Sequence, residues 1–192
     1  MILILLIILL MAGGVIAGVL AKWNVLLARW IALAAVVTDF VIALAIWVQH
    51  DFISGASTPW IMDFQAPWIP SFGITFHLSL DGLSLLMLIL TFFLGIFAVL
   101  ASWKEIQYRA GFFHFNLLWV LAGITGVFLT MDLFLFYFFW EVMLIPMYFL
   151  IGIWGHENRQ YAAFKFFIFT QASGLLMLLA AAALWLAGRW TA

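Results

Sequence analysis

One acidic residue lies in the middle of a long apolar run, where it could take part in proton chemistry. Glu141 is about eight residues, or roughly 12 Å, into the run 133–154. An acidic side chain at the centre of a bilayer costs about 2.5–3.5 kcal/mol on insertion scales, which favours its neutral form. A carboxyl group held there can bind and release a proton near physiological pH, as a proton relay requires. The alternative is a neutral side chain that hydrogen-bonds to a neighbouring helix as a packing contact.

A proline lies close to this carboxyl group in the same run. Pro146 has no N–H group, so the carbonyl of Val142 loses its helical partner and the helix is expected to kink. Breaks of this kind are tolerated in membrane helices where they face protein or a hydrated cavity. The spacing therefore places a free carbonyl and a kink within one turn of Glu141, which favours the functional interpretation.

Two further polar residues could begin a proton path from the cytoplasm. Lys165 lies near the start of the run 162–187, where its long stem can also reach the membrane surface without any catalytic role. His114 lies at the start of the run 112–130, where an interfacial histidine is more often anchored among lipid headgroups than catalytic. We therefore take Glu141 as the candidate proton-translocating residue, with Lys165 and His114 as candidates on the cytoplasmic side.

Asp39 is a second acidic residue inside an apolar run, midway along residues 30–49. A relay role and a hydrogen-bonded packing contact are equally open for it. The sequence predicts no metal and no cofactor bound by this chain. It contains no cysteine, its four histidines share no ligand spacing, and it has no nucleotide-binding glycine motif.

The composition explains why these few polar residues stand out. Of the 192 residues, 69% are hydrophobic and 8% are charged, whereas soluble domains average about 25% charged residues. Such a chain could not cover its surface with polar groups, which excludes a soluble globular enzyme and a disordered chain. Seven basic residues form no basic patch, which excludes a nucleic-acid binder. The sequence therefore predicts a polytopic membrane protein surrounded by the lipid bilayer.

The candidate residues must be positioned by membrane-spanning helices, which need about 20 apolar residues each. Suitable runs cover residues 2–21, 30–49, 83–103, 112–130, 133–154 and 162–187. The first run has no basic flank and is too long for a cleaved signal peptide, so it is expected to remain as a helix. Gly14 and Gly18 predict close helix packing there, and the short connector 130–132 predicts an antiparallel helix hairpin. The predicted fold is all-α, a transmembrane helical bundle with about six spans.

The charged connectors predict how the bundle is oriented. The long polar connector is 50–82, with the acidic residues and prolines Asp51, Asp63, Asp81, Pro59, Pro67 and Pro70. If the N-terminus is outside, the cytoplasmic side receives Lys22, Arg29, Lys104, Arg109, Arg159 and Lys165. The other side then receives Arg189 as its one basic residue. By the positive-inside rule we therefore predict a periplasmic N-terminus and a periplasmic loop over 50–82.

Several motifs resemble those of a known family of membrane subunits. They are DGLSLL (81–86), SWKEI (102–106), GFFH (111–114), FWEVMLIPMYFL (139–150) and KFFIFTQASG (165–174). From about Arg29 to its end, the chain resembles the subunit M family of bacterial NADH:quinone oxidoreductase (respiratory complex I). This family belongs to the antiporter-like membrane subunits, which are related to subunits of multisubunit cation/proton antiporters.

The resemblance implies a longer parent fold and a role for Glu141. The family has about fourteen helices, which include an inverted pair of five-helix repeats. Within a single transmembrane domain 1–192, residues 1–110 would form helices one to three and residues 111–192 the first three helices of a repeat. The Glu of the family's Trp-Glu motif is a key proton-translocation residue, and here that position is Glu141. The lysines that the family pairs with it lie on later helices, so an N-terminal fragment is expected.

The function implied by the resemblance is that of a proton-translocating subunit of NADH:quinone oxidoreductase in the bacterial inner membrane. NADH, FMN, iron–sulfur clusters and quinone would be bound by other subunits. The expected partners are the other complex I membrane subunits, including neighbouring antiporter-like subunits. Two alternatives stay open: a subunit of a multisubunit cation/proton antiporter, and an inert truncated fragment. The isolated chain is expected to be inactive.

Overall fold

The fold consists of a helical bundle and a β-hairpin. The computed structural model describes residues 1–49, 60–70 and 74–190, with residues 185–190 described as backbone alone. Asp51 and Pro59 of the predicted connector lie outside the described residues, as does the side chain of Arg189.

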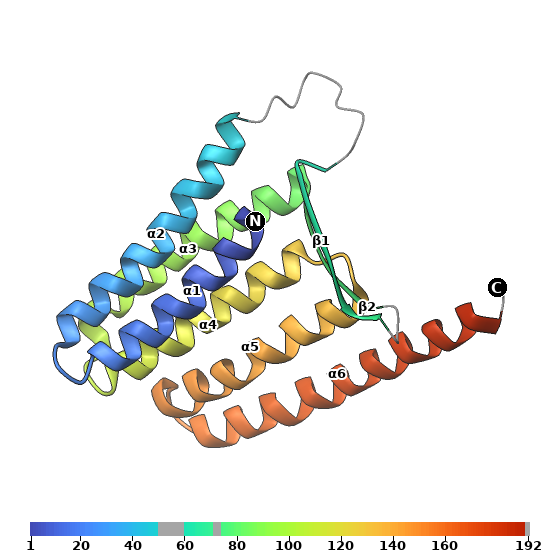
Figure 1. The fold of residues 1–192 in the computed structure, drawn as a ribbon. Helices are drawn as coiled ribbons and strands as arrows, with labels where there is room; N and C mark the ends of the chain where they lie inside the picture. The colour runs from blue at the N-terminus through green and yellow to red at the C-terminus, as the bar shows by residue number, and fades with distance from the viewer. Residues whose placement is uncertain (50–59, 71–73, 191–192) are drawn as a thin grey trace.

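The predicted membrane spans are present as helices. They are α1 (Ile2–Leu20), α2 (Val25–Gln49), α3 (Gly82–Glu105), α4 (Ala110–Leu129), α5 (Leu133–Trp154) and α6 (Arg159–Trp190). The described residues contain 6 helices that are long and apolar enough to cross a membrane. This confirms the predicted all-α polytopic bundle, in which the helices lie side by side (Figure 1). The direction in which the bundle crosses the bilayer stays a prediction.

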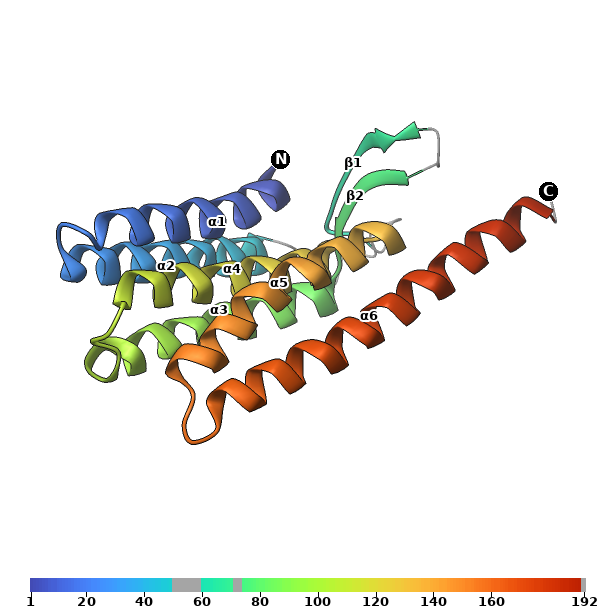
Figure 2. The same ribbon diagram turned by 90° about the horizontal axis from the view of Figure 1, so that it is seen from below.

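The order of the helices in space differs from their order in the sequence. α1 packs along α4 and α2, and α2 also packs against α3. α4 lies in the middle of the bundle, because it contacts α1, α2, α3 and α5. α6 packs against α5 at the edge of the bundle, as Figure 2 shows. Helices one to three and helices four and five therefore share one packed core.

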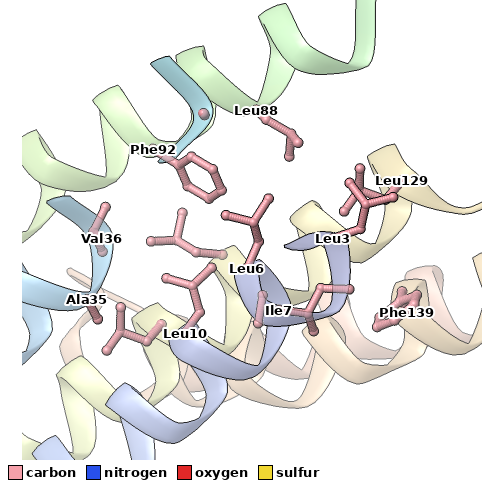
Figure 3. Packing of buried hydrophobic residues seen from close by; sticks show 14 of the residues in the cluster. Leu3, Leu6, Ile7, Leu10, Ala35, Val36, Leu88, Phe92, Leu129 and Phe139 are labelled. Carbon is pink, nitrogen blue, oxygen red and sulfur yellow. The ribbon is translucent and has the colours of Figure 1, made fainter. Parts of the chain in front are cut away.

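The core is a cluster of apolar side chains from the first five helices and from β2 of the hairpin (Figure 3). Leu3, Leu6 and Leu10 of α1 are buried in it. Phe92 of α3 and Leu129 of α4 are fully buried in the same cluster. In a bilayer the lipid tails are as apolar as leucine, so such contacts stabilise the bundle by close packing rather than by removal from water.

Small residues allow α1 and α4 to approach closely. A Cβ atom added at Gly14 would lie 2.9 Å from Cδ1 of Trp119 and 3.2 Å from the carbonyl oxygen of Phe115. Gly18 lies one turn further along α1, and a Cβ atom added there would lie 3.5 Å from Cβ of Phe115. Gly111 of α4 lies directly against α1 in return. The close packing predicted at Gly14 and Gly18 is therefore confirmed.

A β-hairpin occupies the part of the connector that was expected to be a polar loop. β1 (Met62–Ile69) pairs antiparallel with β2 (Ile74–Leu80), with a register shift between Pro67 and Ile69. Apolar and polar side chains alternate along β2, which is the period-two pattern of a strand. The sequence contains this pattern, but the prolines and acidic residues around it are typical of a loop, which is why the sequence predicts no strand there.

The hairpin is attached to the turn between α4 and α5. The N–H of Met131 donates to the carbonyl of His77 at 3.0 Å. The N–H of Thr75 donates to Oδ2 of Asp132 at 3.3 Å. β2 and the beginning of α5 are therefore held together by hydrogen bonds.

Three polar side chains gather on one face of the hairpin. The Ser79 hydroxyl donates to Oδ1 of Asp63, and Nε2 of His77 lies 2.7 Å from the same oxygen. The hydrogen bond from Ser79, followed by that from His77, holds the pKa of Asp63 below its usual value. Ionised Asp63 therefore stabilises the hairpin above its unfolded-chain pKa of about 3.9. This stabilisation is lost as the pH falls through the lower pKa of the folded state.

Replacing Asp63 with asparagine is expected to loosen the hairpin at neutral pH, because the charge-assisted hydrogen bonds are lost. The measurement is the protection of the β1 and β2 amides from hydrogen–deuterium exchange in the intact protein, corrected for the intrinsic rate. Asp63→Asn should lower the protection at pH 7 and match the wild-type protein at a pH well below about 3.9. A deficit that stays the same at acid pH would contradict this assignment.

Candidate functional site

The candidate site is built on α5, and the first residues of that helix set its position. The side chain of Asp132 caps the helix, because its Oδ1 accepts from the N–H groups of Phe134 at 2.8 Å and Leu135 at 3.2 Å. Capping of this kind satisfies the free N–H groups of the first turn. α5 then runs through Pro146 to Trp154. The proline does not end the helix, and the predicted kink stays a prediction.

Two glycines of α4 hold α5 at a defined depth. A Cβ atom at Gly123 would lie 2.8 Å from Cβ of Met143 and 3.2 Å from the carbonyl oxygen of Phe139. Gly126 lies directly against the ring of Phe139. Because both contacts are close, α5 cannot slide along α4 without a clash.

The Glu141 carboxyl group lies at the interface between α5 and α6. Its Oε1 atom is so close to Gly174 of α6 that an added Cβ atom would collide with it. The ring of Tyr137 lies one turn earlier on α5, 3.7 Å from the position of a Cβ atom added at Gly174. Its hydroxyl group interacts with the Glu141 carboxyl group. Glu141 and Tyr137 therefore meet α6 at Gly174, where the absence of a side chain makes room for them.

The Oε1 atom of Glu141 is buried and has no hydrogen-bond partner among the described residues. A buried oxygen of this kind normally has a partner, so it requires an explanation in each structure. A carboxyl group that binds and releases a proton, or that binds an internal water, provides one. The arrangement can thus hold a proton within the membrane, between two helices.

His114 is fully buried in the middle helix of the bundle. Its Nδ1 donates to the carbonyl oxygen of Ala110 at 2.7 Å, and its Nε2 has no partner among the described residues. The expectation that His114 is anchored among lipid headgroups is therefore wrong, because α4 is surrounded by other helices. On an axial rise of 1.5 Å per residue, His114 also lies about 15 Å or more from the depth of Glu141.

Lys165 is exposed on α6, with its Nζ 5.8 Å from the ring centre of Tyr161 and 6.0 Å from that of Phe169. The segment from Lys165 to Gly174 makes about 2.5 helical turns, so the two residues lie on opposite sides of α6. The structure thus brings Glu141 together with Tyr137 and Gly174, and not with Lys165. The roles of these residues in proton transfer stay predictions.

Two members of the site were missed in the sequence. Tyr137 could have been found, because it precedes Glu141 by four residues and so lies on the same face of a helix. Gly174 carries no such signal, since its importance comes from the helix that packs against it. Within the described residues, no three His, Asp or Glu side chains gather in a way that could hold a metal ion.

Gly174→Ala is expected to disturb the site without unfolding the bundle, because the new methyl group would displace the Glu141 carboxyl group. Moving a side chain off its preferred rotamer costs about 0.5–1.5 kcal/mol, which corresponds to about a two- to tenfold lower rate. The control is Gly152→Ala on α5, where the added Cβ would lie 3.4 Å from Ala163, an ordinary contact. Proton translocation at the wild-type rate in Gly174→Ala, measured by vesicle acidification, would argue against this position for the carboxyl group.

Comparison with known proteins gives the class of this membrane bundle. Residues 130–192, which contain Glu141 and Gly174, match the family model described as NADH:quinone oxidoreductase/Mrp antiporter, TM. The chain belongs to this family of antiporter-like membrane subunits.

Several of its curated relatives carry a more particular name, NADH-quinone oxidoreductase subunit M. The Escherichia coli (strain K12) protein is 52% identical over 180 residues, which are 90% of this chain and 35% of the relative. The Pseudomonas aeruginosa protein is 52% identical over 178 residues, which are 88% of this chain and 35% of the relative. The chain therefore spans about a third of the length of these curated relatives.

Solved structures share the fold. A chain of respiratory complex I from Thermus thermophilus with bound NADH superposes with a TM-score of 0.72 at 27% identity, covering 91% of this chain and 34% of that chain. A chain of the Mrp complex from Dietzia sp. DQ12-45-1b superposes with a TM-score of 0.77 at 23% identity, covering 95% of this chain and 19% of that chain. The second likeness is one of fold alone.

Proposed function

We propose that this chain forms part of a proton-translocating membrane subunit of an NADH:quinone oxidoreductase. In this proposal other subunits carry electrons from NADH to quinone, and this subunit couples that reaction to proton movement. The observation that supports it is the Glu141 carboxyl group, whose Oε1 is buried against Gly174 without a hydrogen-bond partner among the described residues. The carboxyl group lies within the segment that matches the family model.

The chemistry required of Glu141 is the binding and release of one proton. A bare carboxylate at this depth is unfavourable, so a proton or an approaching cation must neutralise it. A small movement of α6 relative to α5 would change the access of water to Oε1, because Gly174 lies directly against it. Such a change alters the relative stability of the charged and neutral forms and so drives proton uptake or release.

The rest of the assignment follows the same proposal. The N-terminus lies on the periplasmic side of a bacterial inner membrane, and the connectors that carry Lys22, Lys104 and Arg159 lie in the cytoplasm. This chain binds no NADH, FMN, iron–sulfur cluster or quinone, which are bound by other subunits. Its partners are the other membrane subunits of the complex, including neighbouring antiporter-like subunits. Lys165 and His114 lie on the cytoplasmic side of the proton path.

Deletion of the gene that encodes this chain tests the proposal. Inverted membrane vesicles from the deletion strain should lose NADH-driven acidification, and the wild-type gene should restore it. The tagged intact protein should also purify together with subunits that oxidise NADH. Unchanged NADH-driven acidification in the deletion strain would overturn the proposal.

A second candidate function is that of a cation/proton antiporter subunit. The family model that matches residues 130–192 includes Mrp antiporters, and a chain of the Dietzia Mrp complex shares the fold. Such a subunit would use the same carboxyl group without electron transfer. Proton flux that depends on sodium and not on NADH, in the same vesicles, would favour this second function.

A further inference from the structure

A second carboxyl group is buried in the bundle, on the other side of α4 from Glu141. Asp39 of α2 has an exposed fraction of 0%. Neither of its carboxyl oxygens has a hydrogen-bond partner among the described residues. The hydrogen-bonded packing contact considered for Asp39 therefore lacks a partner in the part of the chain that the structure describes. An ionisable side chain in this condition requires another explanation.

The helices around Asp39 supply no opposite charge near it. α1 contains no titratable residue, and those of α3 are Lys104 and Glu105 at its end. The titratable residue of α4 is His114, and the other one of α2 is Arg29. Arg29 lies ten residues before Asp39, or about 15 Å along the helix axis, and donates to the carbonyl of Ile106.

The packing of α2 against α4 places a hydroxyl group at the level of Asp39. α2, α3 and α4 meet at Gly95, where an added Cβ atom would lie 3.1 Å from Val36 and 2.9 Å from Leu121. Asp39 lies one turn beyond Val36, and Thr125 lies one turn beyond Leu121. Figure 1 shows that α2 and α4 run in the same direction. Residues 39 and 125 therefore lie at about the same depth along the two helices. Thr125 is also fully buried.

The hydroxyl group of Thr125 can receive a hydrogen bond. Its Oγ1 donates to the carbonyl oxygen of Leu121 at 2.8 Å, which leaves its lone pairs free to accept. A protonated carboxyl group has one O–H donor, whereas a carboxylate has none. Because Asp39 makes no direct hydrogen bond among the described residues, an acid O–H can reach Thr125 through one water molecule. A carboxylate at this depth would also lack a counter-charge, which favours the acid.

The candidate site on α5 lies at the same depth as Asp39, on the far side of α4. Gly123 of α4 is level with Met143 of α5, and Gly126 is level with Phe139. Since residue numbers rise along α4 as they fall along α5, Thr125 is level with Glu141. The chain thus carries two buried carboxyl groups at one depth, on opposite sides of α4.

We propose that Asp39 is a second proton-binding site of this chain, in which the neutral carboxylic acid is held beside the Thr125 hydroxyl group with an internal water molecule. The proton on the acid takes the place of the missing counter-charge. It exchanges with solvent through the internal water, and no other bond is made or broken. The site does not depend on the electron-transfer function proposed above.

Infrared spectroscopy of the intact protein in membranes tests this proposal through the carbonyl stretching band of a protonated carboxylic acid. Asp39→Asn should remove one such band, and transfer of the wild-type protein to D2O should shift that band. Thr125→Val should shift it as well, because a hydrogen-bond acceptor is lost. The matched control is Thr38→Val, since the Thr38 hydroxyl makes the same kind of bond, to Ala34 at 2.7 Å, on an exposed part of α2.

The outcomes separate this site from the candidate site on α5. Glu141→Gln should leave the Asp39 band in place whatever its effect on proton translocation. An unchanged carbonyl region in Asp39→Asn would show that Asp39 is ionised and would overturn the proposal. A band that does not shift in D2O, or that is unaffected by Thr125→Val, would also overturn it. The Thr125→Val measurement keeps the test open if the Asp39 variant does not fold.

Discussion

Replacing Glu141 with glutamine is expected to reduce proton translocation to about a hundredth of the wild-type rate or less, since loss of a proton-transferring group typically costs at least 10²-fold. Glutamine has the same shape, so it keeps the contact with Gly174 and leaves the interface between α5 and α6 intact. Its amide does not ionise at physiological pH, however, so glutamine cannot bind or release the proton. The complex should therefore assemble normally and fail in its chemistry.

The measurement is NADH-driven acidification of inverted membrane vesicles, with assembly followed by purification of the complex. A matched control is Glu157→Gln, because Glu157 is exposed in the connector between α5 and α6 and lies outside the buried interface. Acidification at the wild-type rate in Glu141→Gln would exclude this carboxyl group from the proton path. Loss of the assembled complex in the same variant would instead indicate a structural role.

Gly123→Ala is expected to lower the free energy of unfolding of the intact protein by up to about 2.5 kcal/mol. The added methyl group would lie 2.8 Å from Cβ of Met143 and 3.2 Å from the carbonyl oxygen of Phe139, so α4 and α5 must move apart. Overpacking of this kind costs about 1–3 kcal/mol. Replacing glycine with alanine inside a helix returns about 0.5–1 kcal/mol of this, so the net effect is destabilising.

Gly152→Ala should leave the free energy of unfolding equal or slightly higher, because its methyl group makes an ordinary contact with Ala163 at 3.4 Å. Alanine has a higher helix propensity than glycine, and no steric clash offsets this gain at position 152. Thermal unfolding of the purified protein in detergent should give a lower midpoint for Gly123→Ala and an equal or higher one for Gly152→Ala. Equal shifts in the two variants would contradict the close approach of α4 and α5.

The apolar pattern predicted the helices well and their ends less well. The run predicted at 133–154 has the same bounds as α5, Leu133–Trp154. α2 begins at Val25, before the predicted start of its run at residue 30. The reason is that hydropathy reports where the bilayer begins, whereas a helix begins where its first N–H groups are satisfied. For α2 the side chain of Asn24 does this, by accepting from the N–H of Leu26 at 2.8 Å.

The sequence by itself determined the class of protein, the six spans and the depth of Glu141. Each of these depends on the length of an apolar run and on one position within it, which are local properties. The membrane helices are apolar on nearly all sides, so polarity does not reveal which faces meet. For this reason the pairing of α1 with α4 and the contact of Gly174 with Glu141 could not be predicted.

Only the tertiary structure decided what surrounds each polar group. Lys165 lies on the opposite side of α6 from Gly174, and His114 of α4 is buried by the helices around it. Asp39 has no hydrogen-bond partner among the described residues. The tertiary structure also attaches the β-hairpin to the beginning of α5. The physical reason is that helices in a bilayer satisfy their own backbone hydrogen bonds, so their arrangement depends on close packing between small and large side chains brought together from distant parts of the chain.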